Sequence, residues 1–235
     1  MNRGTAGRDI LAEDLTPPPT AGEPQAGKLE GARFASPMPA MPDEELSLLR
    51  RVADADRKAF ETLYHLYYRR LFAYLFKLTR RGDLVEEVLN DVMFAIWTGA
   101  ARFDGRSRPS TWIFGIAYHK ALKALARQAS AGGTRAAAAG TGDDLGREVE
   151  EAATGEGPQS LLERREVANT LGKALGALSA EHRAVVELTY YYELSYGEIA
   201  EIVGCPVNTV KTRMFHARRR LRELLPALGL GSRTG

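Results

Sequence analysis

Apolar residues recur every three or four positions along two stretches of the chain, 43–127 and 160–226. This recurrence places apolar side chains along one side of an α-helix, whereas a half-buried strand would alternate apolar and polar residues. The β-branched residues fall inside the same helical patterns, and the sequence has no convincing strand pattern. The pattern therefore predicts an all-α fold of two small helical modules, module one (43–127) and module two (160–226).

Three other segments lack this periodicity. Residues 1–42 hold seven of the eleven prolines and are predicted to form a disordered arm. Residues 128–159 are rich in glycine, alanine and acids, and they have few large apolar side chains. Such a segment cannot bury enough surface to offset the entropy of ordering it, so it is predicted to be a flexible acidic linker. Residues 227–235 are predicted to be a disordered tail.

Module two has the pattern of a helix-turn-helix. Two helix starts are marked by capping boxes, in which a serine hydroxyl and a glutamate carboxylate bind free amides of the first turn: Ser160 with Glu163, and Ser195 with Glu198. After the second box comes a short apolar helix, then Gly204 as the turn, then a longer helix over about 207–225. This arrangement is typical of a DNA-binding unit that inserts its second helix into the major groove.

The longer helix of this motif has an apolar side and a cationic side. The apolar side, which is predicted to face inward, carries Val207, Val210, Met214, Ala217, Leu221 and Leu225. The rest of the helix carries the candidate DNA contacts Asn208, Thr209, Lys211, Thr212, Arg213, Phe215, Arg218, Arg219 and Arg222. Six Lys or Arg residues and no acid stand between Lys211 and Arg222, whereas an ordinary solvated face mixes both signs. Residues near the helix start are placed to contact base edges, and the later arginines are placed to contact phosphates.

Module one contains a helix, 83–97, with a wide apolar stripe on one side and acids on the other. The polar side carries Asp83, Glu86, Glu87, Asn90, Asp91 and Phe94. A phenylalanine among carboxylates is unusual on a solvated surface, and it fits an anchor that binds another protein. In the alternative, Phe94 packs against another helix of module one. A catalytic or cation site would need a second set of partners in a cleft, which the sequence does not indicate.

The next segment of module one, 102–127, is basic. Its candidate DNA contacts are Arg102, Arg106, Arg108, Trp112, His119, Lys120, Lys123 and Arg127. A helix is predicted to begin near Ser110 or Thr111, with Phe114 and Tyr118 on its buried side. Trp112 falls among the cations, where it suits stacking on unpaired bases while the cations hold the phosphates. The alternative is that Trp112 is an ordinary core residue.

Composition limits the chemistry that the chain can carry. The formal net charge is only +2, so affinity for a polyanion depends on where the charge is placed. Cys205 is the one cysteine and the four histidines are far apart in the sequence, which excludes an internal disulfide and a thiolate zinc site. We therefore expect no metal, no cofactor and a cytoplasmic location. No apolar run approaches the roughly 20 residues that span a bilayer, so no membrane partner is expected.

With both modules in this order, the chain resembles the sigma factors of bacterial RNA polymerase, in the small extracytoplasmic-function (ECF) group. The residues that carry the resemblance are AFETLYHLYYRRLFAYLFKLTR (59–80), DLVEEVLNDVMFAIW (83–97), ARFDGRSRPSTWIFGIAYHKALKALAR (101–127) and LSAEHRAVVELTYYYELSYGEIAEIVGCPVNTVKTRMFHARRRL (178–221). The resemblance implies a promoter-specificity subunit that directs transcription initiation and is not an enzyme.

The resemblance also implies a role for each surface. The helix 83–97 is expected to dock through its acidic side on the coiled coil of the polymerase β′ subunit. The segment 102–127 is expected to open the minus-ten promoter element and to capture a flipped base of the non-template strand. Module two is expected to bind the minus-thirty-five element as duplex and to touch the β flap. An anti-sigma factor is a possible further partner in such a family.

The residues alone leave two other functions open. A stand-alone helix-turn-helix regulator would use module one to bind an effector or to dimerise, and it would bind specific duplex DNA without polymerase. A nuclease or recombinase would use the acids of 83–91 with a metal ion, and it would cleave strands only with a divalent cation. No other feature of the sequence supports the nuclease.

Overall fold

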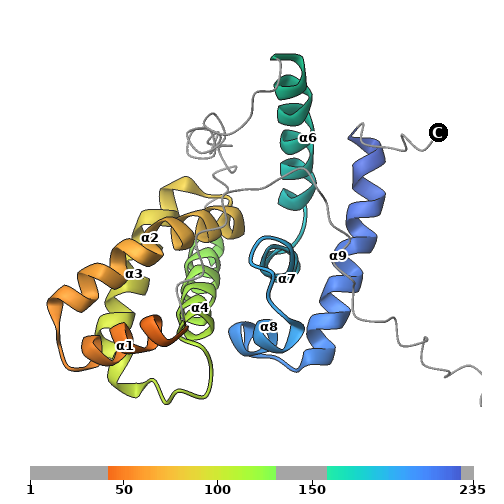
Figure 1. Cartoon of the computed structure of the whole chain (residues 1–235). Helices are drawn as coiled ribbons and strands as arrows, with labels where there is room; N and C mark the ends of the chain where they lie inside the picture. The colour runs from red at the N-terminus through yellow and green to blue at the C-terminus, as the bar shows by residue number, and fades with distance from the viewer. Residues whose placement is uncertain (1–41, 131–157, 229–235) are drawn as a thin grey trace, which may run out of the picture. The chain divides into compact units, whose positions relative to one another are not determined.

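The computed structural model describes residues 42–130 and 158–228, and this part of the chain forms eight α-helices without a strand (Figure 1). Module one contains α1 (Pro42–Ala53), α2 (Arg57–Thr79), α3 (Gly82–Gly99), the 3-10 helix η1 (Ala100–Arg102) and α4 (Pro109–Ser130). Module two contains α6 (Pro158–Gly176), α7 (Ala180–Tyr190), α8 (Tyr196–Val203) and α9 (Val207–Ala227). The all-α prediction is therefore confirmed. None of these helices has the length and hydrophobicity of a bilayer-spanning segment.

The helices extend beyond the predicted module ends. α4 continues to Ser130, so the first residues of the predicted linker are helical. α6 begins at Pro158, ahead of the start that Ser160 predicts, and α9 runs one residue past the predicted end of module two. The predicted arm up to residue 41, the middle of the linker (131–157) and the tail from residue 229 lie outside the described residues.

The centre of module one is the pair α2 and α3. Asp56 starts α2, because its carboxylate accepts hydrogen bonds from the backbone amides of Lys58 at 2.9 Å and Ala59 at 3.1 Å. The predicted apolar stripe of α3 is buried at Leu84, Val85, Val88, Leu89, Val92, Met93 and Ile96. Trp97, the last member of that stripe, is half-buried and packs edge-on against Phe60 of α2. The acidic side of α3 consequently faces outward.

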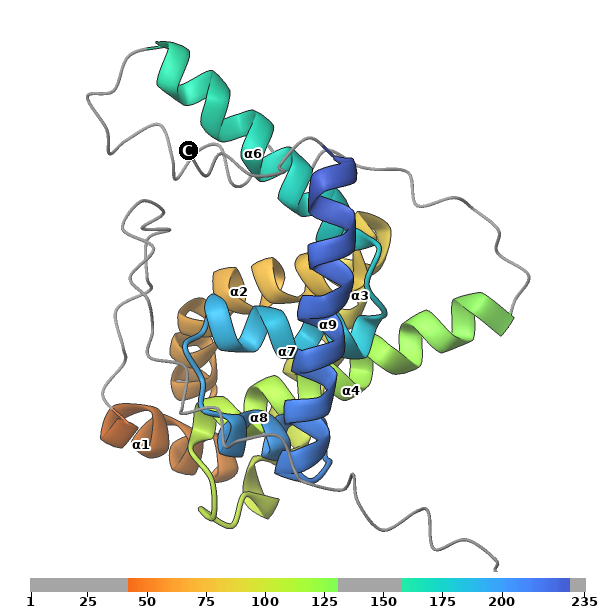
Figure 2. The ribbon, with the colours of Figure 1, turned by 90° about the vertical axis from the view of Figure 1, so that its right-hand side faces the viewer.

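The helix-turn-helix of module two is present as predicted. The amide of Glu198 donates to the Ser195 hydroxyl at 3.3 Å, and the amide of Ser195 donates to the Glu198 carboxylate at 2.9 Å, which completes the capping box. Gly204 ends α8 at φ 67°, a left-handed conformation that glycine adopts without steric cost. α9 then leads away past α7 and continues beside α6 (Figure 2).

The inward side of α9 is only partly as predicted. Val210, Met214 and Ala217 are buried, and Leu221 and Leu225 are half-buried. The prediction that Val207 faces inward is wrong, because this side chain is 40% exposed. Helical side chains lean toward the preceding turn, and Val207 is the first residue of α9, so it has no preceding turn to cover.

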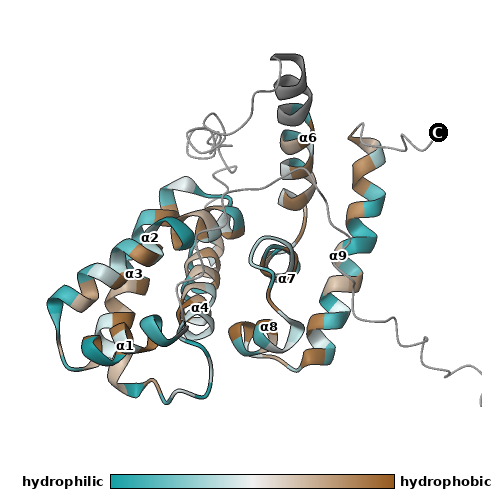
Figure 3. Ribbon diagram, in the orientation of Figure 1, coloured by the Kyte–Doolittle hydropathy of each residue, from teal (hydrophilic) through white to brown (hydrophobic). Residues whose placement is uncertain are grey.

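The two modules share one apolar core, which the sequence does not predict. α8 packs on α4 and α7 packs on α2, and buried residues of both modules form one cluster. Figure 3 shows hydrophobic and hydrophilic bands on both α8 and α9, and the buried residues of α8 that belong to this cluster are Ile199, Ala200, Ile202 and Val203. The core therefore holds the helix-turn-helix against the helices of module one.

Candidate protein and nucleic-acid interfaces

The acidic side of α3 is a solvent-facing surface. All six of its members are exposed: Asp83, Glu86, Glu87, Asn90, Asp91 and Phe94. The ring of Phe94 is 67% exposed, so the alternative in which it packs inside module one is wrong. An exposed aromatic ring among carboxylates is a surface that can anchor a protein partner with complementary basic groups.

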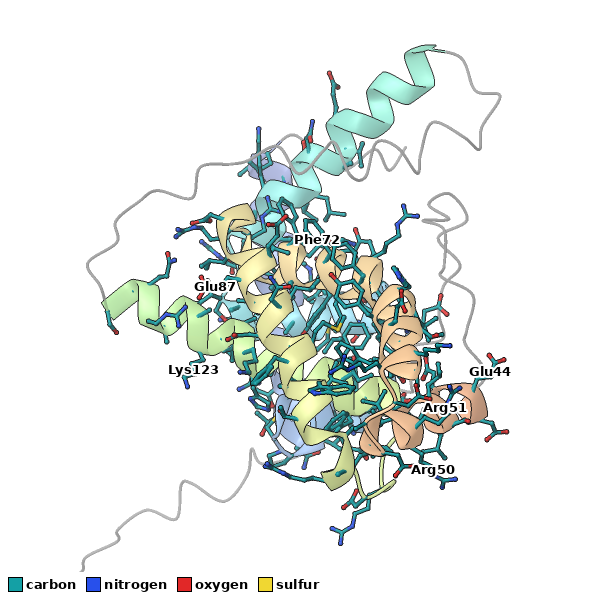
Figure 4. The ribbon with its side chains drawn as sticks, turned by 90° about the vertical axis from the view of Figure 1, so that its left-hand side faces the viewer. Glu44, Arg50, Arg51, Phe72, Glu87 and Lys123 are labelled. Carbon is teal, nitrogen blue, oxygen red and sulfur yellow. The ribbon has the colours of Figure 1, made fainter. Side chains whose placement is uncertain are left out.

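Basic side chains contact this acidic side along one edge. Glu87 pairs with Arg127 of α4, Asp91 lies 3.7 Å from Lys120 of α4, and Asp83 pairs with Arg81 at 2.7 Å. Figure 4 shows Glu87 on α3 and Lys123 on the neighbouring α4. The two α4 cations in these pairs belong to the predicted minus-ten set, so the acidic and the basic surface of module one adjoin. Pairs this exposed contribute little to stability.

Part of the basic surface of module one borders a hollow beside α4. A cavity of about 520 Å³ is lined by Trp112, His119, Lys120 and Lys123, among other residues of α4, its preceding loop and α8. Trp112 is half-buried, and its ring packs against Phe103 with the centroids 5.5 Å apart. The ring of Trp112 therefore packs against module one and also lines the cavity, and its stacking on unpaired bases stays a prediction.

η1 and the loop between it and α4 carry the remaining predicted cations of module one. Arg102, Arg106 and Arg108 are all exposed. Arg106 pairs with Asp104 at 3.1 Å inside the loop, and Arg108 pairs with Glu198 of α8 at 3.3 Å. The sequence assigns Glu198 only to the capping box, so the ion pair with Arg108 is a contact that sequence analysis misses.

On α9 the predicted DNA contacts form one outward surface with two exceptions. The exposed members are Asn208, Lys211, Thr212, Phe215, Arg218, Arg219 and Arg222, whereas Thr209 and Arg213 are half-buried. Arg213 lies beside the hydroxyl of Tyr118 on α4, where burial raises the pKa of the phenol and the guanidinium opposes that rise. Arg213 is therefore turned toward module one.

A buried polar cluster between α2 and α7 is also absent from the predicted sites. Arg183 is 6% exposed and donates to the carbonyl of Leu78 at 2.7 Å, while Lys77 lies 3.7 Å from the carboxylate of Glu187. Burial lowers the pKa of Lys77 to about 8 and raises the pKa of Glu187. The signal that could have located the cluster is the placement of Arg183 and Glu187 among the apolar residues of α7.

No metal site joins these surfaces in the described residues, where no three His, Cys, Asp or Glu side chains gather closely enough to hold an ion. The acids of α3 lie along an open helix side and do not converge in a cleft. A metal-dependent nuclease would require such convergence, so this geometry gives that alternative no support.

Comparison with known proteins matches the two modules to two regions of one protein family. The Sigma-70 region 2 family matches residues 63–131, and the Sigma-70, region 4 family matches residues 168–221. RNA polymerase sigma factor YlaC of Bacillus subtilis (strain 168) is 30% identical over 175 residues, which cover 71% of this chain and 92% of YlaC. The ECF RNA polymerase sigma factor RpoE of Cereibacter sphaeroides is 27% identical over 76% of this chain and 93% of its own length.

Two solved structures have the same helical architecture. The structure of CnrH in complex with the cytosolic domain of CnrY matches with a TM-score of 0.54 and 24% identity, over 79% of this chain and 99% of that one. The sigma factor RpoE in complex with the anti-sigma factor NepR from Bartonella quintana matches with a TM-score of 0.51 and 25% identity, over 72% of this chain and 98% of RpoE. From its two family regions and these relatives, the chain belongs to the sigma factors of RNA polymerase, in their ECF group.

Proposed function

We propose that this sigma factor uses three separate surfaces to direct promoter recognition for transcription initiation. The acidic side of α3 binds core RNA polymerase at the β′ coiled coil. The basic surface of α4 and its preceding loop binds the minus-ten element, and the outward surface of α9 binds the minus-thirty-five element. The chain carries no catalytic step in this proposal, because the polymerase supplies the chemistry of RNA synthesis.

The observation that carries the polymerase assignment is the exposure of Phe94 within the acidic side of α3. A large exposed ring costs free energy in water, and a partner that covers it recovers that cost. The carboxylates around it select a basic partner surface and exclude DNA, because phosphates and carboxylates repel. This surface therefore fits a protein partner.

The cavity beside α4 supports the minus-ten assignment. An unpaired base could stack on the part of Trp112 that lines this cavity, while Lys120 and Lys123 bind the adjoining phosphates. Paired bases cannot enter such a cavity, so binding there favours the melted promoter over the duplex. Promoter opening is then a shift of population toward the state that the protein binds better.

The outward surface of α9 supports the minus-thirty-five assignment. Asn208, Lys211 and Thr212 lie in the first two turns of a helix that follows a glycine turn, which is where a helix-turn-helix contacts base edges. Arg218, Arg219 and Arg222 lie further along and suit phosphates. Module two is also proposed to touch the β flap of the polymerase, as the sequence resemblance implies.

An anti-sigma factor is proposed as a further partner. The matched RpoE structure holds its sigma factor in complex with the anti-sigma factor NepR. A protein that covered the acidic side of α3 or the basic surface of α4 would block polymerase or promoter binding, so either surface gives such a partner a target.

Run-off transcription over a promoter library tests the proposed function. Purified chain together with core polymerase should give discrete transcripts from a subset of templates, and neither component alone should do so. A gel shift separates this outcome from that of a stand-alone regulator, because a regulator shifts a specific duplex without polymerase. A specific shift by the chain alone, together with no transcript on any template, would show that the proposal is wrong.

A further inference from the structure

Three consecutive tyrosines at the end of α7 lie in different surroundings. The ammonium of Lys77 on α2 lies over the ring of Tyr191, 2.9 Å from its centroid. The hydroxyl of Tyr192 donates to the carbonyl of Arg70 on α2 at 3.1 Å. Tyr190, the last residue of α7, is instead 52% exposed and contacts α9. The predicted DNA contacts do not include this tyrosine, although it borders the helix that carries them.

The partner of Tyr190 on α9 is Arg218. The guanidinium Nη2 of Arg218 donates to the Tyr190 hydroxyl oxygen at 2.7 Å. The guanidinium carbon lies 5.9 Å from the centroid of the tyrosine ring, within the range of a cation–π contact. These two contacts hold a long side chain in one orientation. A side chain that is already ordered loses less conformational entropy when it binds a ligand.

The positive charge of Arg218 has no carboxylate partner within residues 42–130 and 158–228. Other exposed arginines differ in this respect, since Arg108 pairs with Glu198 at 3.3 Å and Arg220 pairs with Glu223 at 3.1 Å. A phenol oxygen is neutral, so the hydrogen bond that it accepts fixes the guanidinium without compensating its charge. The charge of Arg218 is therefore available to an anion.

The Tyr190 hydroxyl also retains a donor. A phenol has one O–H donor besides its acceptor oxygen, and a guanidinium has further N–H donors besides the one on Tyr190. Because the oxygen accepts from Arg218, the O–H group is left to donate, and it has no other hydrogen-bond partner in the part of the chain that the structure describes. Tyr190 and Arg218 together thus offer donors from two side chains and one positive charge. An anion with several oxygens suits this set.

The pair lies at an edge of the proposed minus-thirty-five surface. Lys211, Phe215, Arg218 and Arg222 follow one another at steps of three or four residues, so they share one side of α9, and all four are exposed. Arg218 is about three turns past the start of the helix. The first turns of such a helix contact base edges, and later residues suit the sugar–phosphate backbone. The anion nearest to this edge is therefore a DNA phosphate.

We propose that Tyr190 and Arg218 form a phosphate clamp, which binds one backbone phosphate of the minus-thirty-five element. Tyr190 orients the guanidinium of Arg218 and donates its own O–H to the same phosphate. This inference rests on the proposed function, because it assumes that the outward surface of α9 binds this duplex. It extends the DNA-binding surface from α9 to the end of α7. The clamp adds affinity and fixes the position of the helix without reading sequence.

The variant Tyr190→Phe tests the clamp, because it removes the hydroxyl and keeps the ring. The complex of the chain with core polymerase is titrated by filter binding on a promoter that run-off transcription has selected. We expect Tyr190→Phe to weaken promoter binding about tenfold, as loss of hydrogen bonds to charged groups does. The slope of log affinity against log salt should stay unchanged, because no charge is removed. Arg218→Ala should lower that slope by about one.

Replacement of single phosphates by uncharged methylphosphonates locates the contact on the DNA. Such a replacement weakens binding of the wild type wherever the protein contacts the phosphate. At one position of the minus-thirty-five element, the effect should be smaller in Tyr190→Phe and in Arg218→Ala, whereas the other positions should keep their wild-type effects. A purely structural role of the hydroxyl would leave the effect of every replacement as in the wild type.

Tyr191→Phe is the matched control, because the same change is made at the next residue, whose ring faces Lys77 on α2. It should bind the promoter with wild-type affinity and show the wild-type methylphosphonate pattern. Circular dichroism establishes that each variant keeps its helices. Pull-down of core polymerase by Tyr190→Phe should equal that of the wild type, because the clamp lies outside the acidic side of α3.

If folded Tyr190→Phe binds the promoter as tightly as the wild type, or keeps the wild-type methylphosphonate pattern, the proposed clamp is wrong. Reduced pull-down of core polymerase by this variant would equally overturn it, because the tyrosine would then contact the polymerase. Run-off transcription by the wild type keeps the two proposals apart. Transcripts together with unaltered promoter binding by Tyr190→Phe refute the clamp alone. Absence of transcripts from every template refutes the proposed function and the clamp with it.

Discussion

Glu87 of α3 pairs with Arg127 of α4, so a residue proposed to bind polymerase is the ion-pair partner of a residue proposed to bind promoter DNA. Both side chains are more than half exposed, and the pair therefore adds little to the stability of module one. Their contact means that a change at Glu87 also alters the charge available at Arg127. A test of either surface has to separate these two effects.

Exchanging the charges of Glu87 and Arg127 distinguishes a direct role of Glu87 in polymerase binding from an indirect role through Arg127. Glu87→Lys with Asp91→Lys should abolish the pull-down of core polymerase, because it replaces two carboxylates of the α3 surface by cations. Exchange of the partners, Glu87→Arg with Arg127→Glu, restores the ion pair but keeps the wrong charge on α3. We expect this exchanged variant to stay deficient in pull-down. Recovery to the wild-type level would mean that Glu87 acts only by holding Arg127.

Two exposed phenylalanines should behave in opposite ways. Phe94→Ala is expected to weaken binding of core polymerase by roughly 2 kcal/mol, or about 30-fold, as loss of an interface anchor does. Phe215 of α9 is similarly exposed, at 63%, so Phe215→Ala is the matched control. It should keep most polymerase binding and lower affinity for the minus-thirty-five element. Equilibrium titration of labelled variants measures the affinity for core polymerase and for the minus-thirty-five element. Equal losses of polymerase binding in the two variants would contradict the assignment of Phe94 to the polymerase interface.

Arg219→Ala should weaken promoter binding by the polymerase complex and reduce its salt dependence. Loss of one phosphate contact lowers the slope of log affinity against log salt by about one. Arg220→Ala is the control, because Arg220 pairs with Glu223 at 3.1 Å and is not in the proposed phosphate set. Filter binding over a series of salt concentrations gives the slopes. An unaltered slope for Arg219→Ala would remove this residue from the phosphate contacts.

The lowered pKa of Lys77 predicts that the free energy of unfolding increases as the pH rises. Its pKa in the folded chain is about 8, below the ordinary value of 10.5, because burial disfavours its charge. Between these two values the unfolded chain binds more protons at this residue, so the free energy of unfolding rises as the pH rises. We expect the wild type to gain about 1 kcal/mol relative to Lys77→Met between pH 8 and 9.5, measured by urea unfolding. Identical pH profiles would show that the pKa of Lys77 is not lowered in the folded chain.

The periodic elements were predictable because their signals are local. The apolar stripe of α3 is buried at seven of its eight positions, and the Ser195–Glu198 box forms as its spacing predicts. The exposure of Phe94 could not be decided from the sequence, because either outcome fits a helix with its acids on one side. Val207 was misplaced because periodicity ignores the end of a helix, where the covering turn is missing.

The association of the modules is not predictable from such patterns. Arg183 and Leu78 are 105 residues apart, and no helical period extends over that distance. Tyr192 stands in a loop, outside any amphipathic stripe, so nothing in its neighbourhood indicates that it packs against Phe114. Arg213 shares the cationic side of α9 in sequence, yet it turns toward Tyr118 because module one lies there.

The carboxylate of Glu198 uses its two oxygens for different tasks. One oxygen accepts the hydrogen bond from the Ser195 amide that starts α8, and the other faces Arg108. Departure of α8 from α4 would therefore free the arginine without unravelling the first turn of α8. The loop before α4 would then carry one more uncompensated positive charge, while the capping box of Ser195 and Glu198 would stay in place.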